Sequence, residues 1–380
     1  MLIKNRNLFR LTRFILLKLP LLFRFFARFR KPQKRLLIIK TDAIGDYILF
    51  RNFIELTKLS ETYKGYKIDV LGNVLWRDIA LKYDKAYVDE FIFIKANLLY
   101  DAPLQTLKLG WQLFANNYEV TLQPTYTRTF INDGLAGLTA AKQIIGFESD
   151  NESIAERYKT KTDTFYTSRL LLPENAYFEF ERSKFFFESV LQQSLSINAT
   201  NIITVSSEVR QGIVIVPSAG ILKRCWEAEK FLELIKLILK HTSHTLYLEG
   251  GPSTIIFADH LKDEIATKRV IDLTGKTTLP EMIELIGNAA LLIANETSAI
   301  HIAVAVKTQS VCVMGGGHFE RFSPYPEYFE SRPVCVYQKM DCYYCNWNCI
   351  YKVAEDEPYP CIGNISVDSV WQAVSPLLLQ

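Results

Sequence analysis

Two carboxylates stand in a short segment that joins an apolar run, residues 36–40, to a helical pattern. They are Asp42 and Asp46, with Gly45 just before the second. Glycine lets the backbone turn tightly there, and the start of a helix stabilises a carboxylate through free N–H groups and the helix dipole. From the residues alone, helix capping is the simpler interpretation. The alternative is that one carboxylate acts as a general base, a role worth about 10²–10⁴-fold in rate.

A second segment, residues 217–226, combines small residues with a pair of cations. Ser218 and Ala219 come just after an apolar strand pattern, and Lys223 and Arg224 precede an amphipathic helical pattern. Small residues and cations at such a turn can hold a diphosphate and neutralise the charge of a leaving group. A solvated basic loop is the alternative.

A third segment places polar residues at the start of a helical pattern. Glu296, Thr297 and Ser298 follow an apolar strand pattern, and His301 lies one turn further on. Backbone N–H groups at a helix start bind anions, so this segment is a second candidate for a phosphate site. A lone His among apolar helical residues is more often a core residue, but the strand-end carboxylate five residues earlier keeps a role in the site open.

Two glycine runs, at 250–251 and 315–317, end further strand patterns. Neither run fits the G-x-G-x-x-G pattern of dinucleotide-binding proteins or the G-x-x-x-x-G-K-[ST] phosphate loop. The sequence therefore argues against a nicotinamide-dependent dehydrogenase and against an ATPase.

Four of the seven cysteines lie within twenty residues, at Cys342, Cys345, Cys349 and Cys361. Four thiolates could bind one tetrahedral structural zinc, and free thiols in a compact loop are the alternative. A four-thiolate site is closed to substrate, so we expect no catalytic metal here. Because no export signal is recognisable, we expect a reducing compartment, in which disulfides are not the default.

The chain from residue 36 onward alternates strand and helix patterns, which is typical of parallel α/β proteins. Strands are expected at 36–40, 67–71, 91–94, 118–122, 143–147, 212–216, 245–249, 290–294 and 310–314, and helices at 44–56, 175–195, 227–240, 279–288 and 299–306. The pattern restarts at residue 212 after a polar stretch, which predicts two Rossmann-like domains facing a cleft. Ligands of such sheets bind at the carboxyl ends of the strands, where the segments described above lie.

The first 35 residues are basic and aromatic. They contain eleven Lys or Arg and no Asp or Glu, whereas the remaining residues carry 33 basic and 41 acidic side chains, a net charge of −8. No uncharged run approaches the ~20 residues of a spanning helix, and Pro20 is expected to interrupt a single helix. We interpret residues 1–34 as an arm that lies on an anionic membrane surface; an extra helix packed on the first domain is the alternative. The acidic body argues against nucleic-acid binding.

Several of these segments together resemble the heptosyltransferase family of bacterial glycosyltransferases, family nine of the sequence classification. The resemblance covers about residues 35–375 of the chain and includes motifs that occur in the family's order. These motifs lie at 35–40, 44–46, 216–219, 223–226, 273–277, 294–303 and 315–325.

The resemblance implies a GT-B fold with an acceptor domain at 35–205, a donor domain at 206–365 and a C-terminal helix at 366–380. It implies inverting transfer, without a cofactor or an essential metal, from a nucleotide-diphosphate sugar similar to ADP-heptose. The implied acceptor is a lipopolysaccharide core or another lipid-linked surface glycan, reached from the inner, cytoplasmic face of the membrane.

The matching positions imply a role for individual residues. Asp46 is the implied general base, and Lys223 or Arg224 stabilises the departing diphosphate. The implied donor-binding residues are Ser218, Ala219, Gly251, Glu296, Thr297, Ser298 and His301.

The sequence departs from the family pattern at several of these positions. Glu296 replaces an Asp, Ser298 replaces a Gly, Cys225 is inserted before a Trp, and Thr254 stands where some members place a ribose-binding carboxylate. These changes leave open a different donor. They also leave open two alternative functions: a GT-B nucleotide-sugar epimerase, or a non-catalytic protein that binds a nucleotide sugar or a glycan.

Overall fold

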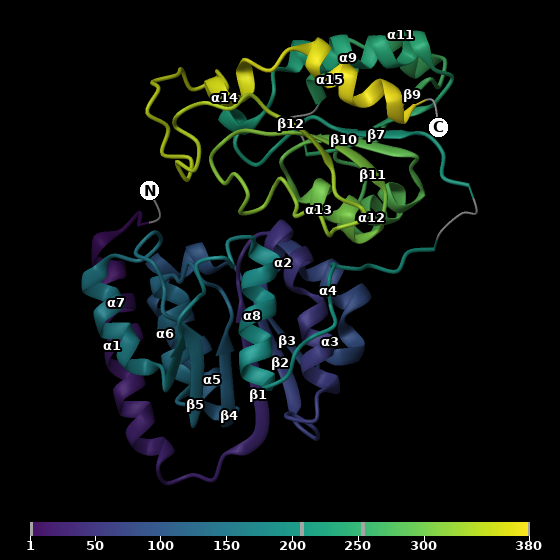
Figure 1. The fold of residues 1–380 in the computed structure, drawn as a ribbon. Coiled ribbons are helices and arrows are strands. Elements are labelled where there is room, and N and C mark those ends of the chain that lie inside the picture. The colour runs from purple at the N-terminus through teal and green to yellow at the C-terminus, as the bar shows by residue number, and fades with distance from the viewer. Residues whose placement is uncertain (1–2, 206–208, 252–254, 379–380) are drawn as a thin grey trace. The chain divides into compact units, whose positions relative to one another are not determined.

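The computed structural model describes residues 3–205, 209–251 and 255–378. The chain divides into two compact units (Figure 1). Unit 1 comprises residues 1–176 and 180–196, and unit 2 comprises residues 177–179 and 197–380. Each unit contains one parallel six-stranded sheet with helices on both of its faces, as the alternating sequence pattern predicts.

The sheet of unit 1 has the strand order β3-β2-β1-β4-β5-β6. Its strands are β1 (Gln33–Lys40), β2 (Lys67–Asn73), β3 (Glu90–Ile94), β4 (Tyr118–Gln123), β5 (Gln143–Phe147) and β6 (Ser168–Leu170). Its helices are α1 (Arg6–Ala27), α2 (Ile44–Phe50), α3 (Asn52–Leu59), α4 (Arg77–Tyr83), α5 (Pro103–Ala115), α6 (Phe130–Thr139), α7 (Glu156–Thr162) and α8 (Glu179–Leu191). The strand order reverses between β1 and β4, and ligands of such sheets bind at this switch point.

The sheet of unit 2 has the order β12-β11-β10-β7-β8-β9, so its switch point lies between β7 and β10. The strands are β7 (Ile213–Val216), β8 (Leu246–Leu248), β9 (Val270–Asp272), β10 (Leu291–Asn295), β11 (Gln309–Val313) and β12 (Val334–Val336). The helices are α9 (Ala228–His241), α10 (Ile255–Asp259), α11 (Lys262–Ala266), α12 (Leu279–Asn288), α13 (Ser298–Ala305), α14 (Pro360–Gly363) and α15 (Val367–Val374).

The nine predicted strands are all present in the described residues, with ends that shift by up to three residues. Three further strands were not predicted: β6, β9 and β12 have three residues each, too few to show a pattern. The predicted helix at 44–56 is divided into α2 and α3 at Arg51, and helix α12 has the predicted bounds.

Helix α1 corrects one expectation about the N-terminal arm. It runs unbroken for 22 residues with Pro20 inside it. Its buried residues are Thr12, Leu16, Pro20 and Phe23, which follow the helical period, and Leu16 and Phe23 belong to one hydrophobic core with residues of α5 and α6. This burial offsets the backbone hydrogen bond that a proline cannot make. None of the described helices is long and apolar enough to cross a membrane.

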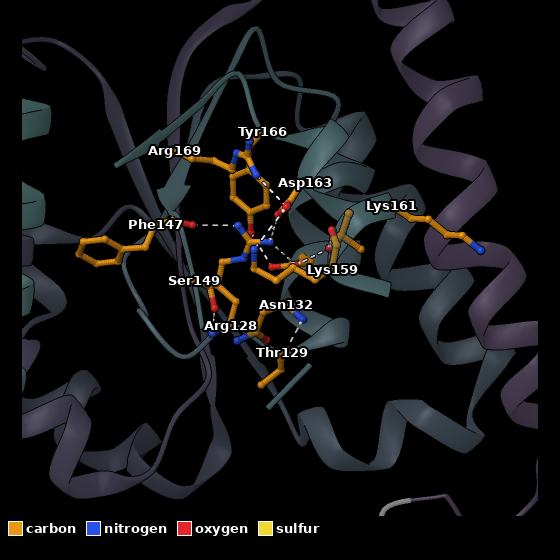
Figure 2. A network of polar contacts seen from close by, with 12 residues as sticks. Arg128, Thr129, Asn132, Phe147, Ser149, Lys159, Lys161, Asp163, Tyr166 and Arg169 are labelled. Carbon is orange, nitrogen blue, oxygen red and sulfur yellow. Dashed lines mark hydrogen bonds and ion pairs between the residues drawn. The ribbon is translucent and has the colours of Figure 1, made fainter. Parts of the chain in front are cut away.

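A buried polar cluster fixes the segment between β4 and α6 (Figure 2). The side chain of Arg128 is fully buried, and its Nη1 donates a hydrogen bond to the carbonyl of Phe147 at 2.8 Å. Its Nη2 donates to Asp133 at 3.0 Å and to Asp163 at 2.5 Å. These bonds connect α6 with the end of β5 and the residues after α7, next to the switch point of unit 1.

Candidate functional site

A pocket of about 1220 Å³ lies at the carboxyl ends of the strands of unit 1. The segments after β1, β2 and β3 contribute to it, as do the segments after β4 and β5. The lining residues are Thr41, Asp42, Ala43, Asn73, Val74, Leu75, Lys95, Ala96, Asn97, Leu98, Tyr100, Thr129, Ile131, Asn151, Glu152, Ser153, Ile154 and Ala155. A pocket of this size, with a mixed polar and apolar wall, can hold several sugar rings of a glycan.

Asp42 is held by neighbours from both sides of the switch point. Its carboxylate lies 2.9 Å from the buried Nζ of Lys40 and accepts a hydrogen bond from the Thr125 hydroxyl at 2.6 Å. Asn73 and Trp76 also donate to the carbonyl groups of Thr41 and Asp42, at 3.0 and 3.2 Å. Asp42 therefore neutralises a buried lysine and fixes the loop.

Asp46 lies in the first turn of α2 and is half-buried. The N-cap position belongs to Ala43, which makes no side-chain capping bond, so neither Asp42 nor Asp46 is the N-cap residue. The next residue, Tyr47, is fully buried, stacks on Trp76 at 3.9 Å and donates its hydroxyl to Asp84 at 2.6 Å. This packing fixes the backbone from which Asp46 projects, although Asp46 is not among the lining residues of the pocket.

A second pocket, of about 410 Å³, lies at the switch point of unit 2. Its lining residues are Val216, Ser218, Ala219, Gly220, Glu249, Gly250, Gly251, Gly275, Thr277, Thr278, Leu279, Met282, Thr297 and Ser298. Five of the predicted donor-binding residues are therefore together around one space: Ser218, Ala219, Gly251, Thr297 and Ser298.

The two segments that flank the switch point are held together by Asn295 at the end of β10. Its Nδ2 donates to the carbonyl of Pro217 at 2.6 Å, and its Oδ1 accepts from the backbone N–H of Trp226 at 2.9 Å. Helix α13 begins next to this point, with Thr297 as its N-cap residue. The free N–H groups at the start of α13 therefore face the region that Ser218 also lines, an arrangement suited to phosphate.

The structure separates the two candidate cations. Lys223 donates to the carbonyl of Val353 at 3.3 Å and lies 3.9 Å from the exposed Glu355. Arg224 instead lies over the ring of Trp347 at 4.3 Å, and its Nε is buried without a hydrogen-bond partner. Burial lowers the pKa of Arg224, and the nearby Glu296 opposes that shift. Neither cation lines the pocket of unit 2.

The inserted Cys225 has a structural role in the same loop. Its Sγ accepts a hydrogen bond from the backbone N–H of Ala219 at 3.1 Å. The Cys225 thiol is buried, which raises its pKa. The uncharged thiol therefore stabilises the turn after β7 through this hydrogen bond.

Glu296 and His301 lie outside the pocket lining. Burial raises the pKa of Glu296 to about 8, and its Oε2 has no hydrogen-bond partner. Burial lowers the pKa of His301 to about 4, so its ring is neutral at pH 7, and its Nδ1 lies 2.6 Å from the hydroxyl of Tyr325. His301 is thus a buried, neutral residue that is paired with Tyr325, and its role in donor binding stays a prediction.

The four clustered cysteines line one narrow cavity of about 10 Å³, together with aromatic residues such as Tyr343 and Trp347. Within residues 3–205, 209–251 and 255–378, no group of three or more His, Cys, Asp or Glu side chains is placed to hold a metal ion. All seven cysteines are free thiols. A structural zinc at Cys342, Cys345, Cys349 and Cys361 stays a prediction from their spacing.

Two residues of the unit 2 site were missed by the sequence reasoning. Asn295 lies inside the motif at 294–303 but was given no role, and Glu249 was counted only as the last residue of the strand expected at 245–249. The signal for Glu249 was available, because an acidic residue directly before two glycines at a strand end can face a ligand. Thr254, which was compared with a ribose-binding position, lies outside the described residues.

Two parallel Rossmann-like sheets, with pockets at their switch points, define a GT-B-type protein. Residues 136–344 match the model of glycosyltransferase family 9 (heptosyltransferase), so the chain belongs to this family and the resemblance seen in the sequence is confirmed. Solved structures with the same fold include ADP-heptose lipopolysaccharide heptosyltransferase II of Escherichia coli (15% identical, TM-score 0.63, 91% of this chain and 99% of that one). A family 9 glycosyltransferase from Veillonella parvula is also similar (17% identical, TM-score 0.64, 92% and 98% covered).

A curated relative matches part of the chain in sequence. Lipopolysaccharide heptosyltransferase 3 of Escherichia coli strain K12 is 36% identical over 134 residues. The matched segment spans 34% of this chain and 38% of that relative.

Proposed function

We propose that the protein transfers a sugar, heptose or a related one, from a nucleotide-diphosphate sugar to a lipopolysaccharide core or another surface glycan. The observation that carries this proposal is the unit 2 pocket in a chain of glycosyltransferase family 9. Ser218, Thr297 and Ser298 line that pocket at the switch point, where an anionic diphosphate is stabilised by helix N–H groups. The relationship to lipopolysaccharide heptosyltransferase 3 supports a heptose donor and a lipopolysaccharide acceptor. The structurally similar heptosyltransferase II is named for ADP-heptose, which makes ADP-heptose the first donor to test.

In the proposed reaction, Asp46 accepts the proton of an acceptor hydroxyl. The hydroxyl oxygen forms a bond to the anomeric carbon of the donor sugar while the bond from that carbon to the diphosphate oxygen breaks. Attack opposite to the leaving group inverts the anomeric centre. The electron pair goes to the diphosphate, whose charge the N–H groups of α13 and a cation of the 217–226 loop stabilise.

Arg224 is the better of the two candidates for that cation. Lys223 already contacts a carbonyl and a carboxylate, whereas the Nε of Arg224 is buried without a hydrogen-bond partner. A planar guanidinium can also donate two hydrogen bonds to a phosphate. Protein cations and helix N–H groups of this kind make a metal-independent reaction the simplest form of the proposal.

The reaction can be tested with Asp46→Asn, assayed with ADP-heptose and lipopolysaccharide acceptors. We expect a loss of about 10²–10⁴-fold in kcat with an unchanged Kd for the donor, because the base acts on the acceptor. Asp78→Asn is the control: this exposed carboxylate in the first turn of α4 is not among the pocket-lining residues, so kcat should stay close to the wild-type value. Transfer by Asp46→Asn at the wild-type rate would exclude Asp46 as the base.

We also propose that α1 places the protein on the anionic inner face of the cytoplasmic membrane. Large apolar side chains on a face of α1 distinct from its buried face are exposed, namely Leu11, Phe14, Leu21, Leu22, Phe25 and Phe26, followed by Phe29. Basic residues lie beside this face, and α1 has no acidic residue in its first turn. Helix α5 packs against α1 and adds the exposed Leu104 and Trp111, with Trp111 next to Phe23. Apolar and basic side chains together suit an anionic lipid surface.

Flotation with vesicles that contain anionic lipid tests this surface. We expect Phe14→Ser/Phe25→Ser/Phe26→Ser to lose most of the bound fraction, and wild-type binding to weaken as salt rises. Substitutions are preferable to a truncation, because Leu16 and Phe23 of the same helix are core residues. The control is Ile203→Ser/Val205→Ser, which removes apolar side chains of unit 2 that are even more exposed. Equal flotation of both variants would exclude the proposed surface.

A further inference from the structure

A further pocket, of about 580 Å³, lies in unit 1 at the edge of the sheet opposite to the 1220 Å³ pocket. It lies where the strands begin, because Pro32 precedes β1, Tyr118 begins β4 and Lys142 precedes β5. Its lining includes the cations Arg24, Arg28 and Lys142, and none of the described residues that line it is an Asp or Glu. We call it the basic pocket. Its volume is within the range of about 300–1,000 Å³ that is usual for ligand sites.

The exposed cations of the basic pocket come from two segments that are far apart in the sequence. Arg28 is the C-cap residue of α1, and Lys142 lies in the turn between α6 and β5. Both side chains are exposed, and neither forms an ion pair with a carboxylate of the described residues. A cation at a helix C-terminus stabilises the helix dipole, which accounts for Arg28 but not for Lys142. An anion in the pocket would meet both side chains.

The other polar side chains of the basic pocket are already bonded to the chain. Asn117 and Thr167 donate hydrogen bonds to main-chain carbonyls, at 2.6 and 3.1 Å. The hydroxyls of Tyr118 and Tyr166 donate to fully buried carboxylates, at 2.8 and 2.7 Å. Arg24 is partly occupied as well, since it donates to two carbonyls, at 3.1 and 2.8 Å. Binding of a ligand in this pocket therefore depends mainly on its two exposed cations.

The basic pocket lies at one end of a row of arginines on α1. The members of this arginine row are Arg6, Arg10, Arg13, Arg24 and Arg28. The helical period of about 3.6 residues places them along one edge of the helix, between its buried face and its exposed apolar face. Phe25 and Phe29, which are 51% and 76% exposed, belong to the apolar face at the pocket end. A lipid headgroup in the pocket can therefore leave its acyl chains against apolar side chains, a contact that a free phosphate ion would not use.

Helix α1 runs from one end of the strands of unit 1 to the other (Figure 1). At its start, the ring of Phe9 lies 6.0 Å from the ring of Tyr100, which lines the 1220 Å³ pocket. At its end, Arg24 and Arg28 line the basic pocket. A membrane surface that lies along α1 therefore passes both pockets. We propose that the basic pocket binds the phosphate group of an anionic phospholipid and thereby fixes the orientation of α1 on the membrane.

This inference rests on the proposed function, since it assumes that α1 lies on an anionic membrane. It adds a specific contact, in which the pocket recognises a lipid phosphate rather than surface charge in general. Attraction to surface charge weakens as salt screens it. Direct hydrogen bonds between cations and a phosphate act at short range and are screened much less. The two kinds of binding can therefore be separated at high salt.

Flotation with vesicles of phosphatidylcholine and phosphatidylglycerol tests the inference. The pocket variant is Arg28→Gln/Lys142→Gln. The control is Arg10→Gln/Arg13→Gln, which removes two exposed cations of the arginine row outside the pocket. At about 0.05 M salt we expect both variants to bind more weakly than the wild type, because each loses two charges near an anionic surface. At about 0.5 M salt the control should bind within about twofold of the wild type, and the pocket variant about tenfold more weakly.

Two results would overturn the inference and leave the proposed membrane surface intact. One is equal binding of the two variants at high salt, and the other is wild-type flotation that occurs at low salt only. Failure of the wild type to float at low salt would instead refute the membrane surface itself. Calorimetry with inorganic phosphate separates the lipid from a free ion. Phosphate binding that is lost in the pocket variant, while the two variants float equally, would assign the pocket to a free anion.

Discussion

Two buried carboxylates, Asp133 of unit 1 and Glu296 of unit 2, differ in how many of their oxygens have hydrogen-bond partners. In unit 1, Asp133 accepts hydrogen bonds from Arg128, from Thr162 at 2.6 Å and from Tyr166 at 2.7 Å, so both of its oxygens are occupied. In unit 2, the buried Oε2 of Glu296 has no hydrogen-bond partner, and the same holds for Oδ1 of Asp69 in unit 1.

A buried carboxylate with two paired oxygens stabilises the fold, whereas one with an unpaired oxygen can still accept a further hydrogen bond. A buried polar network in which every group is paired is rigid. Removing one member leaves its partners buried without a hydrogen bond or counter-charge, which lowers the stability of the folded state. A buried carboxylate with a free oxygen destabilises the ligand-free protein and is suited to binding a donor group. Removing the cation that pairs with Asp133 should therefore lower the stability of the protein, whereas removing the charge of Glu296 should raise it.

Arg128→Met gives the largest expected change in stability. Breaking a buried ion pair from one side costs about 3–5 kcal/mol, because Asp133 stays buried without its cation. The midpoint of urea unfolding should fall accordingly. Nucleotide binding by unit 2 should persist under conditions in which the variant is folded.

Arg169→Met is the control for this effect. Arg169 is one third exposed and pairs with Asp163 at 2.7 Å, on the outer side of the same cluster. Exposed pairs contribute less than about 1 kcal/mol. If the two variants lose equal stability, the cluster is not the stabilising element that its burial indicates.

Glu296→Gln is expected to increase the stability of the folded state, by less than the amount that Arg128→Met removes. Burial raises the pKa of Glu296 from 4.5 to about 8. Between these values the folded state holds a proton that the unfolded state releases, so the stability of the wild type falls as pH rises from about 4.5 to 8. Gln carries no charge and avoids this loss.

The stability of Glu296→Gln relative to the wild type should therefore grow with pH, by on the order of 1–3 kcal/mol at pH 8. Urea midpoints measured at pH 5, 6.5 and 8 test this. Glu233→Gln, which changes an exposed carboxylate of α9, should show no such trend. Parallel pH profiles of wild type and Glu296→Gln would contradict the assignment of Glu296 as a buried, unsatisfied acid.

The sequence predicts the fold where the pattern is local and repeated. Apolar runs such as residues 36–40 and 213–216 become central strands, and the small residues after them become pocket walls. Short edge strands such as β6 escape prediction because their three residues are defined by pairing with β5, which is a long-range contact. Pro20 misled for a similar reason: its helical state depends on the packing of α1 against α5 and α6, which are far away in the sequence.

The sequence predicts which segments form the site, but it predicts less well which contacts their side chains make. Ser218 and Thr297 could be placed at phosphate segments, because strand-to-helix turns have a known geometry. Lys223 and Arg224 are equivalent in sequence and differ only through their contacts, with Val353 and with Trp347. Glu249 likewise accepts its hydrogen bond from Thr277 through a long-range contact, which no local pattern encodes.

Tyr325→Phe is the smallest and most discriminating change, because it converts a paired buried group of unit 2 into an unpaired one. The Tyr325 hydroxyl lies 2.6 Å from Nδ1 of His301, and both residues are buried. Phe keeps the ring packing, so the loss is that of one hydrogen bond, about 1 kcal/mol.

Tyr337→Phe, at a tyrosine that is 41% exposed, should change stability by less than about 0.5 kcal/mol. A loss confined to Tyr325→Phe would mean that unit 2, like unit 1, depends on paired polar groups in its core, with the unpaired Oε2 of Glu296 as an exception. Equal stability of the two variants would remove that contrast, because an unpaired buried group would then cost unit 2 nothing measurable.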